Sequence, residues 1–288
     1  AGLRGASVND SQHPGALALD PDRPAPAPTG VALAPALDVA EQDWPTGHCV
    51  DQDLGEGITS CLHGDPAATK TAVVVGDSHA AQFSTALAEF ARQEGAGRWK
   101  VHVITRNGCP FSTVPPTNAG VPLTVCSEEN LVKLDVIRGL APDLVLTAAM
   151  SPESYREDLN WTWESTDRMV EGYRAVLGPL SAAGIPVAVI REVPRPAKPV
   201  VACLQRHPDR TAECDTPRAR AVGSPGDPLA DAATGLDGVR VVDLTDWICR
   251  ADVCPAVVGN VIVYRDNHLT DTYVKSLAVP LAVALGLR

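Results

Sequence analysis

Short apolar runs alternate along the chain with longer segments in which apolar residues recur at helical spacing. The most informative run, residues 72–75, is uninterrupted and rich in valine, which is typical of a central parallel strand buried on both faces. Over residues 79–93 the spacing becomes helical, with Phe83, Leu87 and Phe90 on one face. This stretch therefore predicts a buried strand, a tight turn and a helix.

The same alternation continues towards the C-terminus. The strands predicted there are residues 100–105, 143–149, 186–190 and 239–244, and the helices are residues 127–140, 167–183 and 271–284. Strands that alternate with helices form a parallel sheet covered on both faces. We therefore predict an α/β fold: a three-layer α/β/α sandwich of flavodoxin-like type, with a central parallel sheet of about five strands.

The first 43 residues differ in composition from the rest. They are rich in Ala and Pro, with four prolines between residues 21 and 28. This composition predicts an extended linker or surface strap over residues 1–43, followed by one domain over residues 44–288. No run of 18 apolar residues predicts a membrane span, because the apolar residues 277–287 are too few and include Pro280.

Charge and motif content exclude several classes of function. The chain of 288 residues carries a formal net charge of −11, so no basic surface for a nucleic-acid partner is expected. No pair of cysteines has the C-x-x-C spacing of a structural zinc site. We therefore predict no metal and no cofactor.

The eight cysteines fall into four neighbouring pairs. Sequential pairing gives the disulfides Cys49–Cys61, Cys109–Cys126, Cys203–Cys214 and Cys249–Cys254. The alternative is a cytosolic enzyme with eight free thiols, but the even number and local spacing favour disulfides and therefore an extracytoplasmic location. Because no signal peptide opens the sequence, we expect a piece of a longer precursor or membrane protein.

Ser78 stands between the first predicted strand and its helix. In open α/β sheets ligands bind at the carboxyl ends of the strands, and N–H groups at a helix start can stabilise an oxyanion. A nucleophilic serine needs a base. His268 precedes the final helix and Asp266 lies two residues before it, which gives the order Ser, Asp, His. The alternative is that Ser78, Asp266 and His268 are only loop and helix-cap residues.

Two blocks of sequence carry a family resemblance. Gly76-Asp77-Ser78-His79 and the Asp266–His268 pair resemble the first and last blocks of the SGNH hydrolase superfamily. Segments that resemble one branch are residues 106–111, 143–146, 246–249, 254–260 and 268–270. That branch is the extracytoplasmic SGNH domain fused behind the membrane domain of acyltransferase family 3 proteins, in its actinobacterial form. The likeness extends from about residue 44 to the C-terminus.

The resemblance implies a role for each of these residues. Ser78 is expected to be the nucleophile, His268 the general base and acid, and Asp266 the residue that orients His268. The backbone N–H groups of Ser78 and Gly108 are expected to form the oxyanion hole. The acid usually stands three residues before the His, so Asp243 and Asp246 stay open as alternatives to Asp266. A third oxyanion donor also stays open, because residues 148–151 contain no Asn.

The resemblance also implies the reaction. We expect an extracytoplasmic O-acyltransferase that passes an acetyl or other short acyl group, by way of an acyl-serine, to a hydroxyl of a cell-envelope glycan. The alternatives are an SGNH esterase and a glycan-binding module without activity. The acyl donor is expected to come from a membrane acyltransferase domain that tethers this domain to the plasma membrane. Trp161 and Trp163 are candidates for stacking on a sugar, with loop packing as the alternative. We expect the isolated domain to be a monomer.

Overall fold

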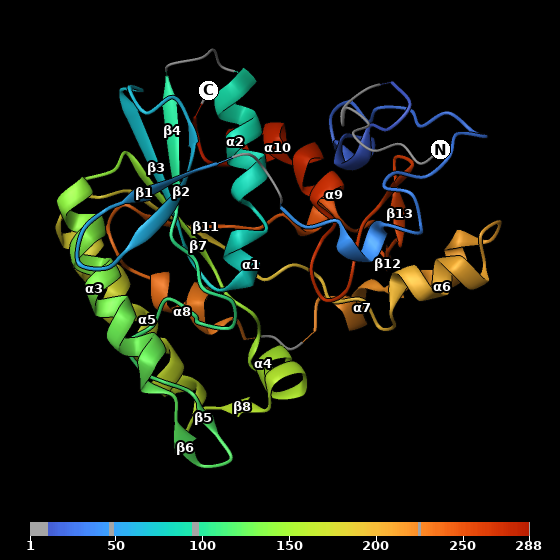
Figure 1. Ribbon diagram of the computed structural model, residues 1–288. Coiled ribbons are helices and arrows are strands. Elements are labelled where there is room, and N and C mark those ends of the chain that lie inside the picture. Colours follow the sequence, from blue (N-terminus) through green and yellow to red (C-terminus); the bar gives the residue numbers. More distant parts are fainter. Residues whose placement is uncertain (1–10, 46–48, 94–97, 224–225, 288) are drawn as a thin grey trace.

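The computed structural model describes residues 11–45, 49–93, 98–223 and 226–287, and it contains a central sheet of seven strands (Figure 1). Their order is β1-β2-β4-β3-β7-β9-β11. The strands are β1 (Val50–Asp53), β2 (Thr59–Gly64), β3 (Lys70–Gly76), β4 (Trp99–Val103), β7 (Leu144–Ala148), β9 (Val187–Ile190) and β11 (Val239–Val242). The five predicted strands are all present and pair in parallel, which confirms the predicted α/β fold.

The hairpin of β1 and β2 lies outside the strands predicted from the sequence. It extends the sheet by two antiparallel strands, so the sheet is mixed rather than wholly parallel. All four residues of β1 are exposed, and an exposed edge strand needs no apolar residues. The hydrophobic pattern therefore carried no signal for it.

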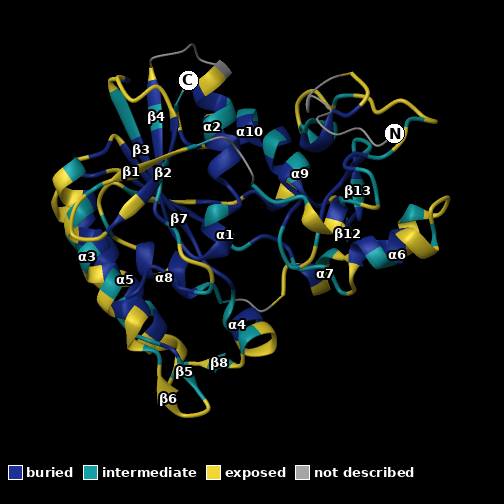
Figure 2. Cartoon of the chain, viewed as in Figure 1, coloured by how far each residue is buried: buried dark blue, intermediate teal, exposed yellow. Residues whose placement is uncertain are grey.

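Helices cover both faces of the sheet and complete the three layers (Figure 1). Alternate residues of β3 point to opposite faces: Val73 and Val75 join one core cluster, and Ala72 and Val74 join the other. The first cluster includes helices α3 (Thr124–Leu140), α5 (Thr166–Ala182) and α8 (Pro228–Ala233). The second includes α1 (Ser78–Ala81), α2 (Ser84–Gln93), α9 (Asp271–Ser276) and α10 (Ala278–Ala284). The central strands β3, β7 and β9 are almost wholly buried, and Figure 2 shows dark blue along β7.

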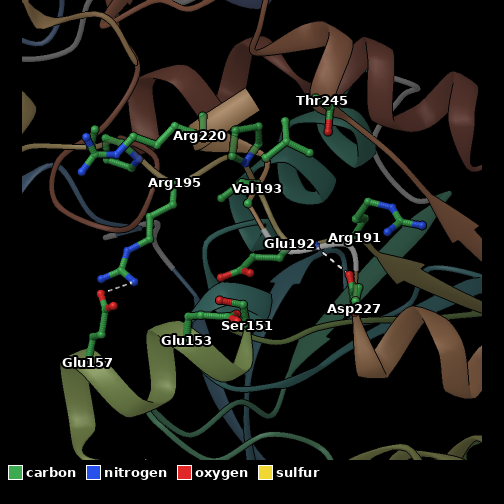
Figure 3. Close-up of a pocket in the computed structure, with 17 residues that line it drawn as sticks. Ser151, Glu153, Glu157, Arg191, Glu192, Val193, Arg195, Arg220, Asp227 and Thr245 are labelled. Atoms are coloured by element: carbon green, nitrogen blue, oxygen red, sulfur yellow. Dashed lines mark hydrogen bonds and ion pairs between the residues drawn. The ribbon is translucent and has the colours of Figure 1, made fainter. Parts of the chain in front are cut away.

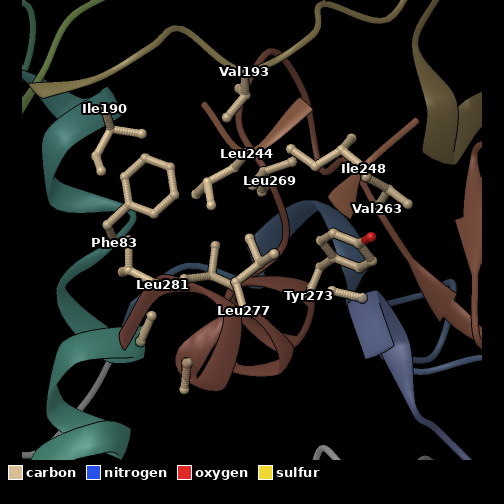
Figure 4. Close-up of a cluster of buried hydrophobic side chains, with 14 of the residues drawn as sticks. Phe83, Ile190, Val193, Leu244, Ile248, Val263, Leu269, Tyr273, Leu277 and Leu281 are labelled. Carbon is tan, nitrogen blue, oxygen red and sulfur yellow. The ribbon is translucent and has the colours of Figure 1, made fainter. Parts of the chain in front are cut away.

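The second core cluster joins the segment after β3 to the C-terminal helices. Phe83, between α1 and α2, lies in one cluster with Leu277, which stands between α9 and α10, and with Leu281, Leu269 and Tyr273 (Figure 4). All five side chains are at most 1% exposed. Complete burial of one such side chain is worth about 1.5–3 kcal/mol. The packing therefore fixes the loop before α9 against the helix that follows β3.

The final helix was predicted as one element over residues 271–284, but it consists of two. The break falls at Leu277, between α9 and α10. Pro280 explains it, because this residue has no N–H to donate to the carbonyl of Ser276 four residues earlier. Despite the break at Leu277, the apolar sides of both helices still pack on the core.

The described part of the predicted strap, residues 11–43, lies against the C-terminal elements. It contains the 3₁₀ helices η1 (Gly15–Leu19) and η2 (Ala40–Gln42). The N–H of Ala16 donates to Ser276 Oγ (2.8 Å), and Ala34 forms a β-bridge with Val261. The carboxylate of Asp43 accepts the N–H of Thr272 (2.9 Å). These contacts bring the end of the strap next to the last helices.

The remaining elements lie in the connections between the main strands and helices. They are β5 (Thr117–Asn118), β6 (Val121–Pro122), α4 (Pro152–Leu159), β8 (Trp161–Thr162), α6 (Val200–Arg206), η3 (Thr211–Cys214), β10 (Thr216–Pro217), α7 (Arg218–Ala221), η4 (Thr245–Trp247), β12 (Val253–Cys254), β13 (Val257–Val258) and β14 (Val261–Ile262). No helix within the described ranges has the length and apolar character needed to cross a membrane.

The eight cysteines form four disulfides, in the predicted sequential pairs Cys49–Cys61, Cys109–Cys126, Cys203–Cys214 and Cys249–Cys254. The loops that they close are 5 to 17 residues long. Closure of a 15-residue loop contributes about 3 kcal/mol in the chain-entropy account. One bridge joins the residue before β1 to β2, and two others tie connecting segments to helices α3 and α6.

Candidate active site

Ser78 is held at the point where β3 turns into α1. Gly76 has a φ of +138°, and a Cβ there would lie 2.8 Å from the carbonyl oxygen of Ala148, so only glycine fits. Asp77 caps the helix, because its carboxylate accepts the N–H of His79 (2.8 Å). The turn leaves Ser78 at the N-terminus of α1 and at the carboxyl end of the sheet.

Ser78, His268 and Asp266 form a connected chain of hydrogen bonds. His268 Nε2 lies 2.8 Å from Ser78 Oγ, and His268 Nδ1 lies 2.7 Å from Asp266 Oδ1. Burial alone would raise the pKa of Asp266, but hydrogen bonds from His268 outweigh it and hold the pKa below its ordinary value. An ionised Asp266 keeps the proton on Nδ1 and leaves Nε2 free to accept the serine proton. The three residues have the geometry of a serine-nucleophile triad.

The two alternatives to Asp266 lie elsewhere. Asp243 Oδ2 is 3.2 Å from Arg191 Nε, and Asp246 accepts a hydrogen bond from Arg218 (2.7 Å). Neither carboxylate forms a described contact with His268. The geometry therefore favours Asp266 as the acid, despite its short spacing in the sequence.

The predicted oxyanion donors face one cavity. Ser78 and Gly108 both line a hollow of about 530 Å³ next to His268. Within the described ranges, neither backbone N–H of these two residues has a hydrogen-bond acceptor. Gly108 has a φ of +75°, and a Cβ on it would lie 3.1 Å from the ring of Trp161. A larger residue at this position would therefore displace the donor or the indole.

The buried carboxylate of Asp77 stabilises the turn between β3 and α1. Asp77 is fully buried and accepts hydrogen bonds from the hydroxyl of Tyr155 and from the N–H of Met150 (3.1 Å). Burial raises the pKa of Asp77, although these donors favour the ionised form. Met150 follows β7, so Asp77 ties the ends of β3 and β7 together below the cavity.

Two residues around His268, Trp44 and Gln82, were missed by sequence reasoning, and His79 was noted only as part of the block that contains Ser78. Trp44 meets the His268 ring edge to face (centroids 5.0 Å apart), and the His79 ring packs against it (4.5 Å). Gln82 Oε1 accepts the N–H of Leu269 (3.0 Å), which fixes the backbone just after His268. Trp44 is 224 positions from His268 along the chain, and only the tertiary fold brings the two together.

His79 is a buried neighbour of the triad rather than a second base. It is 2% exposed, and neither of its ring nitrogens has a hydrogen-bond partner in the described part of the chain. Burial, and then the positive charge on His268, hold the pKa of His79 well below its ordinary value. A neutral ring at this place packs against His268 without competing for its proton.

The two candidate sugar-stacking residues occupy different places. Trp161 lines the cavity beside Gly108, and its ring is parallel to that of Tyr155 (6.4 Å between centroids). Trp163 is not part of the cavity wall: its indole N–H donates to the carbonyl of Val114 (3.1 Å), and its ring packs edge-on against Tyr155. The surroundings of Trp163 agree with the packing alternative.

One group of potential metal ligands is present among the described residues. The sulfur atoms of Cys49 and Cys61 lie close to the side chain of His63. However, the two sulfurs are joined in a disulfide and are not free thiolates. This group is therefore not a metal centre in the oxidised protein.

Comparison with known proteins decides the family. The family model described as "SGNH domain (fused to AT3 domains)" matches residues 48–282, which include Ser78, Asp266 and His268. The chain belongs to this family. The SGNH domain is accordingly an enzyme of the SGNH type, in a family of acyl transfer and hydrolysis. Comparison with curated proteins finds no significant match.

The first of two similar solved structures supports the fold of the SGNH domain. The periplasmic domain of a lipopolysaccharide acetyltransferase from Salmonella ser. Paratyphi A is 14% identical in sequence; the match covers 77% of this chain and 85% of that one, with a TM-score of 0.58. An α/β hydrolase from the metagenome of Lake Arreo, Spain, is 16% identical over 76% of this chain and 96% of that one, with a TM-score of 0.43. The family and the four disulfides together indicate an extracytoplasmic domain.

Proposed function

We propose that the SGNH domain transfers an acetyl or other short acyl group, by way of an acyl-Ser78 intermediate, to a hydroxyl group of a cell-envelope glycan. The observation that carries the proposal is the hydrogen-bonded chain Ser78–His268–Asp266 at the edge of an open cavity. Such a chain activates a serine for covalent acyl transfer.

The first half of the reaction acylates the serine. Ser78 Oγ attacks the carbonyl carbon of the donor ester while His268 Nε2 takes the hydroxyl proton. The negative charge on the carbonyl oxygen is stabilised by the N–H groups of Ser78 and Gly108, which have no acceptor within the described chain. The tetrahedral intermediate then collapses: the donor C–O bond breaks, and the leaving alcohol takes the proton from His268.

The second half passes the acyl group on. A glycan hydroxyl gives its proton to His268 Nε2 and attacks the acyl carbon, and the bond to Ser78 Oγ breaks as the serine regains a proton. Water in place of the glycan gives the esterase reaction with the same residues. The cavity is open to solvent, so occupation by the acceptor decides between transfer and hydrolysis. A binding module without activity would not need the aligned triad.

The donor and the anchor are part of the same proposal. We infer that a membrane acyltransferase domain delivers the acyl group on the outer side of the plasma membrane and tethers this domain there. The family supports this inference, because its members are SGNH domains fused to AT3 domains.

The proposal is tested with an aryl acetate as donor and mixed oligosaccharides as acceptors. The parent protein should release the aryl alcohol and acetylate part of the sugar pool, whereas Ser78→Ala should do neither above background. Aryl ester turnover by Ser78→Ala at a rate close to the parent would contradict the proposal. Release of aryl alcohol by the parent with no sugar product at any acceptor concentration would establish the esterase instead.

A further inference from the structure

The connection after β4 carries Gly108, whose N–H the proposed mechanism uses as an oxyanion donor. Residues 104–116 belong to no helix or strand of the described chain. The N–H of Arg106 donates to the carbonyl of Gly76 (3.0 Å), which joins the connection to the turn that holds Ser78. The N–H of Cys109 donates to the carbonyl of Arg106 (2.9 Å) and closes a tight turn around Gly108. The place of this turn therefore depends on support from neighbouring elements.

One face of α3 supplies much of that support. Four side chains follow the spacing i, i+3, i+4 and i+7 and therefore share this face: Cys126, Glu129, Asn130 and Lys133. Cys126 is bonded to Cys109, and Glu129 forms an ion pair with Arg106. These contacts hold the connection to α3 on both sides of Gly108.

Asn130 binds the backbone of the same connection directly. It is 1% exposed, and its Nδ2 donates to the carbonyls of Pro110 (2.7 Å) and Ser112 (2.8 Å). An amide nitrogen has two hydrogens, so these bonds use its full donor capacity. Pro110 and Ser112 are themselves buried, and a buried carbonyl that loses its donor is costly to leave unpaired. The side chain of Asn130 therefore fixes the chain immediately after Cys109.

The other side of the connection lies against α5. The N–H of Thr113 donates to the carbonyl of Gly172 (3.2 Å), and a Cβ on Gly172 would lie 2.8 Å from the Cβ of Val114. Phe111, between the two carbonyls that Asn130 binds, is 1% exposed and belongs to the core cluster of α3 and α5. Residues 110–114 are thus a fixed base from which the turn at Gly108 extends to the cavity.

We propose that Asn130 is a positioning residue of the acyl-transfer reaction: its amide fixes the backbone at Pro110 and Ser112 and thereby keeps the N–H of Gly108 directed at the oxyanion. The inference rests on the proposed function and adds a residue that does not line the catalytic cavity. An oxyanion donor acts on charge that develops in the transition state, so its displacement lowers kcat more than it raises KM.

The chain offers a matched control at the same edge of the sheet. A hollow of about 470 Å³ lies at the carboxyl ends of β9 and β11, and Figure 3 shows Asp227 on its wall. The carboxylate of Asp227 accepts the N–H groups of Glu192 (3.2 Å) and Ala230 (3.0 Å). Like Asn130, Asp227 holds a connection through two hydrogen bonds from side chain to backbone, but it does not support the chain at Gly108. Asp227→Ala therefore removes a comparable support elsewhere.

The first experiment measures kcat and KM for an aryl acetate in Asn130→Ala, Asn130→Asp and Asp227→Ala, below the unfolding transition of each variant. Asn130→Asp keeps the shape of the side chain but turns a carboxylate towards two carbonyl oxygens. Both Asn130 variants should lower kcat by about ten- to hundredfold, less than the loss of a whole oxyanion donor, with KM within about threefold of the parent. Inhibition by an aryl trifluoromethyl ketone, which adds to Ser78 Oγ and places an oxyanion in the hole, should weaken by a similar factor.

Asp227→Ala should keep the kcat, KM and inhibition of the parent. Parent-like kcat and inhibition in a folded Asn130→Ala or Asn130→Asp would overturn the inference. An equal loss of kcat in Asp227→Ala would also overturn it, because the effect would then follow from any weakened connection at this edge.

The second experiment needs no turnover and so separates this inference from the proposed function. Asn107-Gly108 is the only Asn-Gly pair in the sequence, so ¹³C-carbonyl Asn with ¹⁵N-Gly labels the amide of Gly108 alone. Its NMR order parameter should be about 0.85 in the parent and in Asp227→Ala and below about 0.6 in Asn130→Ala. That loss of order supports the role of Asn130 even if the parent turns over no ester, a result that would contradict only the proposed function. An unchanged order parameter and chemical shift in Asn130→Ala would overturn the inference even if Ser78 is acylated.

Discussion

One carboxylate oxygen of Asp266 accepts two hydrogen bonds from His268. Oδ1 lies 2.7 Å from the ring Nδ1 and 2.7 Å from the backbone nitrogen of the same residue. An acid two residues before its histidine can do this because the chain turns tightly there: the N–H of Arg265 donates to the carbonyl of His268 (3.1 Å), and Tyr264 and Leu269 form a β-bridge just outside the turn. The turn thus compensates for a spacing that is one residue shorter than the family pattern.

The first prediction concerns this acid. Asp266→Asn should lower kcat for an aryl ester by up to about 10⁴-fold, because an amide favours the wrong tautomer of His268. Asp243→Asn and Asp246→Asn, whose carboxylates pair with Arg191 and Arg218, are the controls and should stay within a few-fold of the parent. A large loss in either control, with Asp266→Asn nearly fully active, would assign the triad acid to that control.

The second prediction concerns Trp44. Its ring covers His268 and also stacks with Arg265 (5.3 Å), while Arg265 Nε stays 3.6 Å from Asp266 Oδ2. Trp44→Ala should free Arg265 to pair more closely with Asp266 in competition with His268, and lower kcat by about tenfold.

Two further variants identify the cause of that loss of kcat. Trp44→Phe should retain most of the activity, and adding Arg265→Ala to Trp44→Ala should restore part of it. A Trp44→Ala enzyme with the kcat and pH profile of the parent would show that Trp44 does not position His268.

The third prediction uses the disulfide beside the oxyanion donor. Cys109 follows Gly108 directly, and its bridge to Cys126 closes a 17-residue separation. Replacement of both cysteines by Ser should lower the free energy of unfolding by about 3 kcal/mol and also lower kcat in the folded protein.

The matched control is the bridge between Cys203 and Cys214. Its cysteines are 11 positions apart in the sequence, and neither of them lines the cavity. Its removal should reduce stability by a similar order but leave kcat nearly as in the parent, measured below the unfolding transition. Equal effects of the two replacements on kcat would exclude a specific role of the first bridge in holding Gly108.

The fourth prediction is a pH dependence of stability. Burial raises the pKa of Glu192 from 4.5 to about 7, and hydrogen bonds from Ser151 and Ser154 only partly offset this. Between these pH values the folded protein keeps a proton that the unfolded chain has lost. The free energy of unfolding should therefore fall as the pH rises from about 4.5 to about 7.

Glu192→Gln tests the origin of this slope. It should flatten the dependence and raise stability above pH 7 by at most about 3 kcal/mol, since one pKa unit corresponds to about 1.4 kcal/mol. Denaturant titrations at several pH values measure the effect, with Glu128→Gln on the surface of α3 as the control. An unchanged slope in Glu192→Gln would remove Glu192 from the account.

The sequence predicted those features that depend on local pattern. The five parallel strands have apolar runs, and the pattern around Ser78 predicts the strand, turn and helix that place this residue at the carboxyl end of the sheet. The hairpin of β1 and β2 was missed because β1 is exposed throughout. Helices α6 and α7 lie in a segment between predicted strands for which no element was predicted; both helices are short, and the disulfide Cys203–Cys214 ties α6 to η3.

Tertiary contacts account for the residues that the sequence did not reveal. Trp44, Gln82 and Tyr155 act through partners far away in the chain, and none belongs to a short motif. Asp158 of α4 accepts hydrogen bonds from Arg195 and Asn267, which lie in two separate connections, and only the folded sheet edge brings the three together. Hydrophobic periodicity does not report such contacts, because polar residues in loops follow no period.

The most direct measurement is the covalent state of Ser78 during turnover. The protein is mixed with an aryl acetate, quenched in acid within the first turnovers, digested and analysed by peptide mass spectrometry. The account predicts one added acetyl group on Ser78, lost again when an acceptor sugar is added before the quench, and no such adduct in Ser78→Ala. Turnover of the ester with Ser78 unmodified at every quench time, and with His268→Ala as active as the parent, would contradict it.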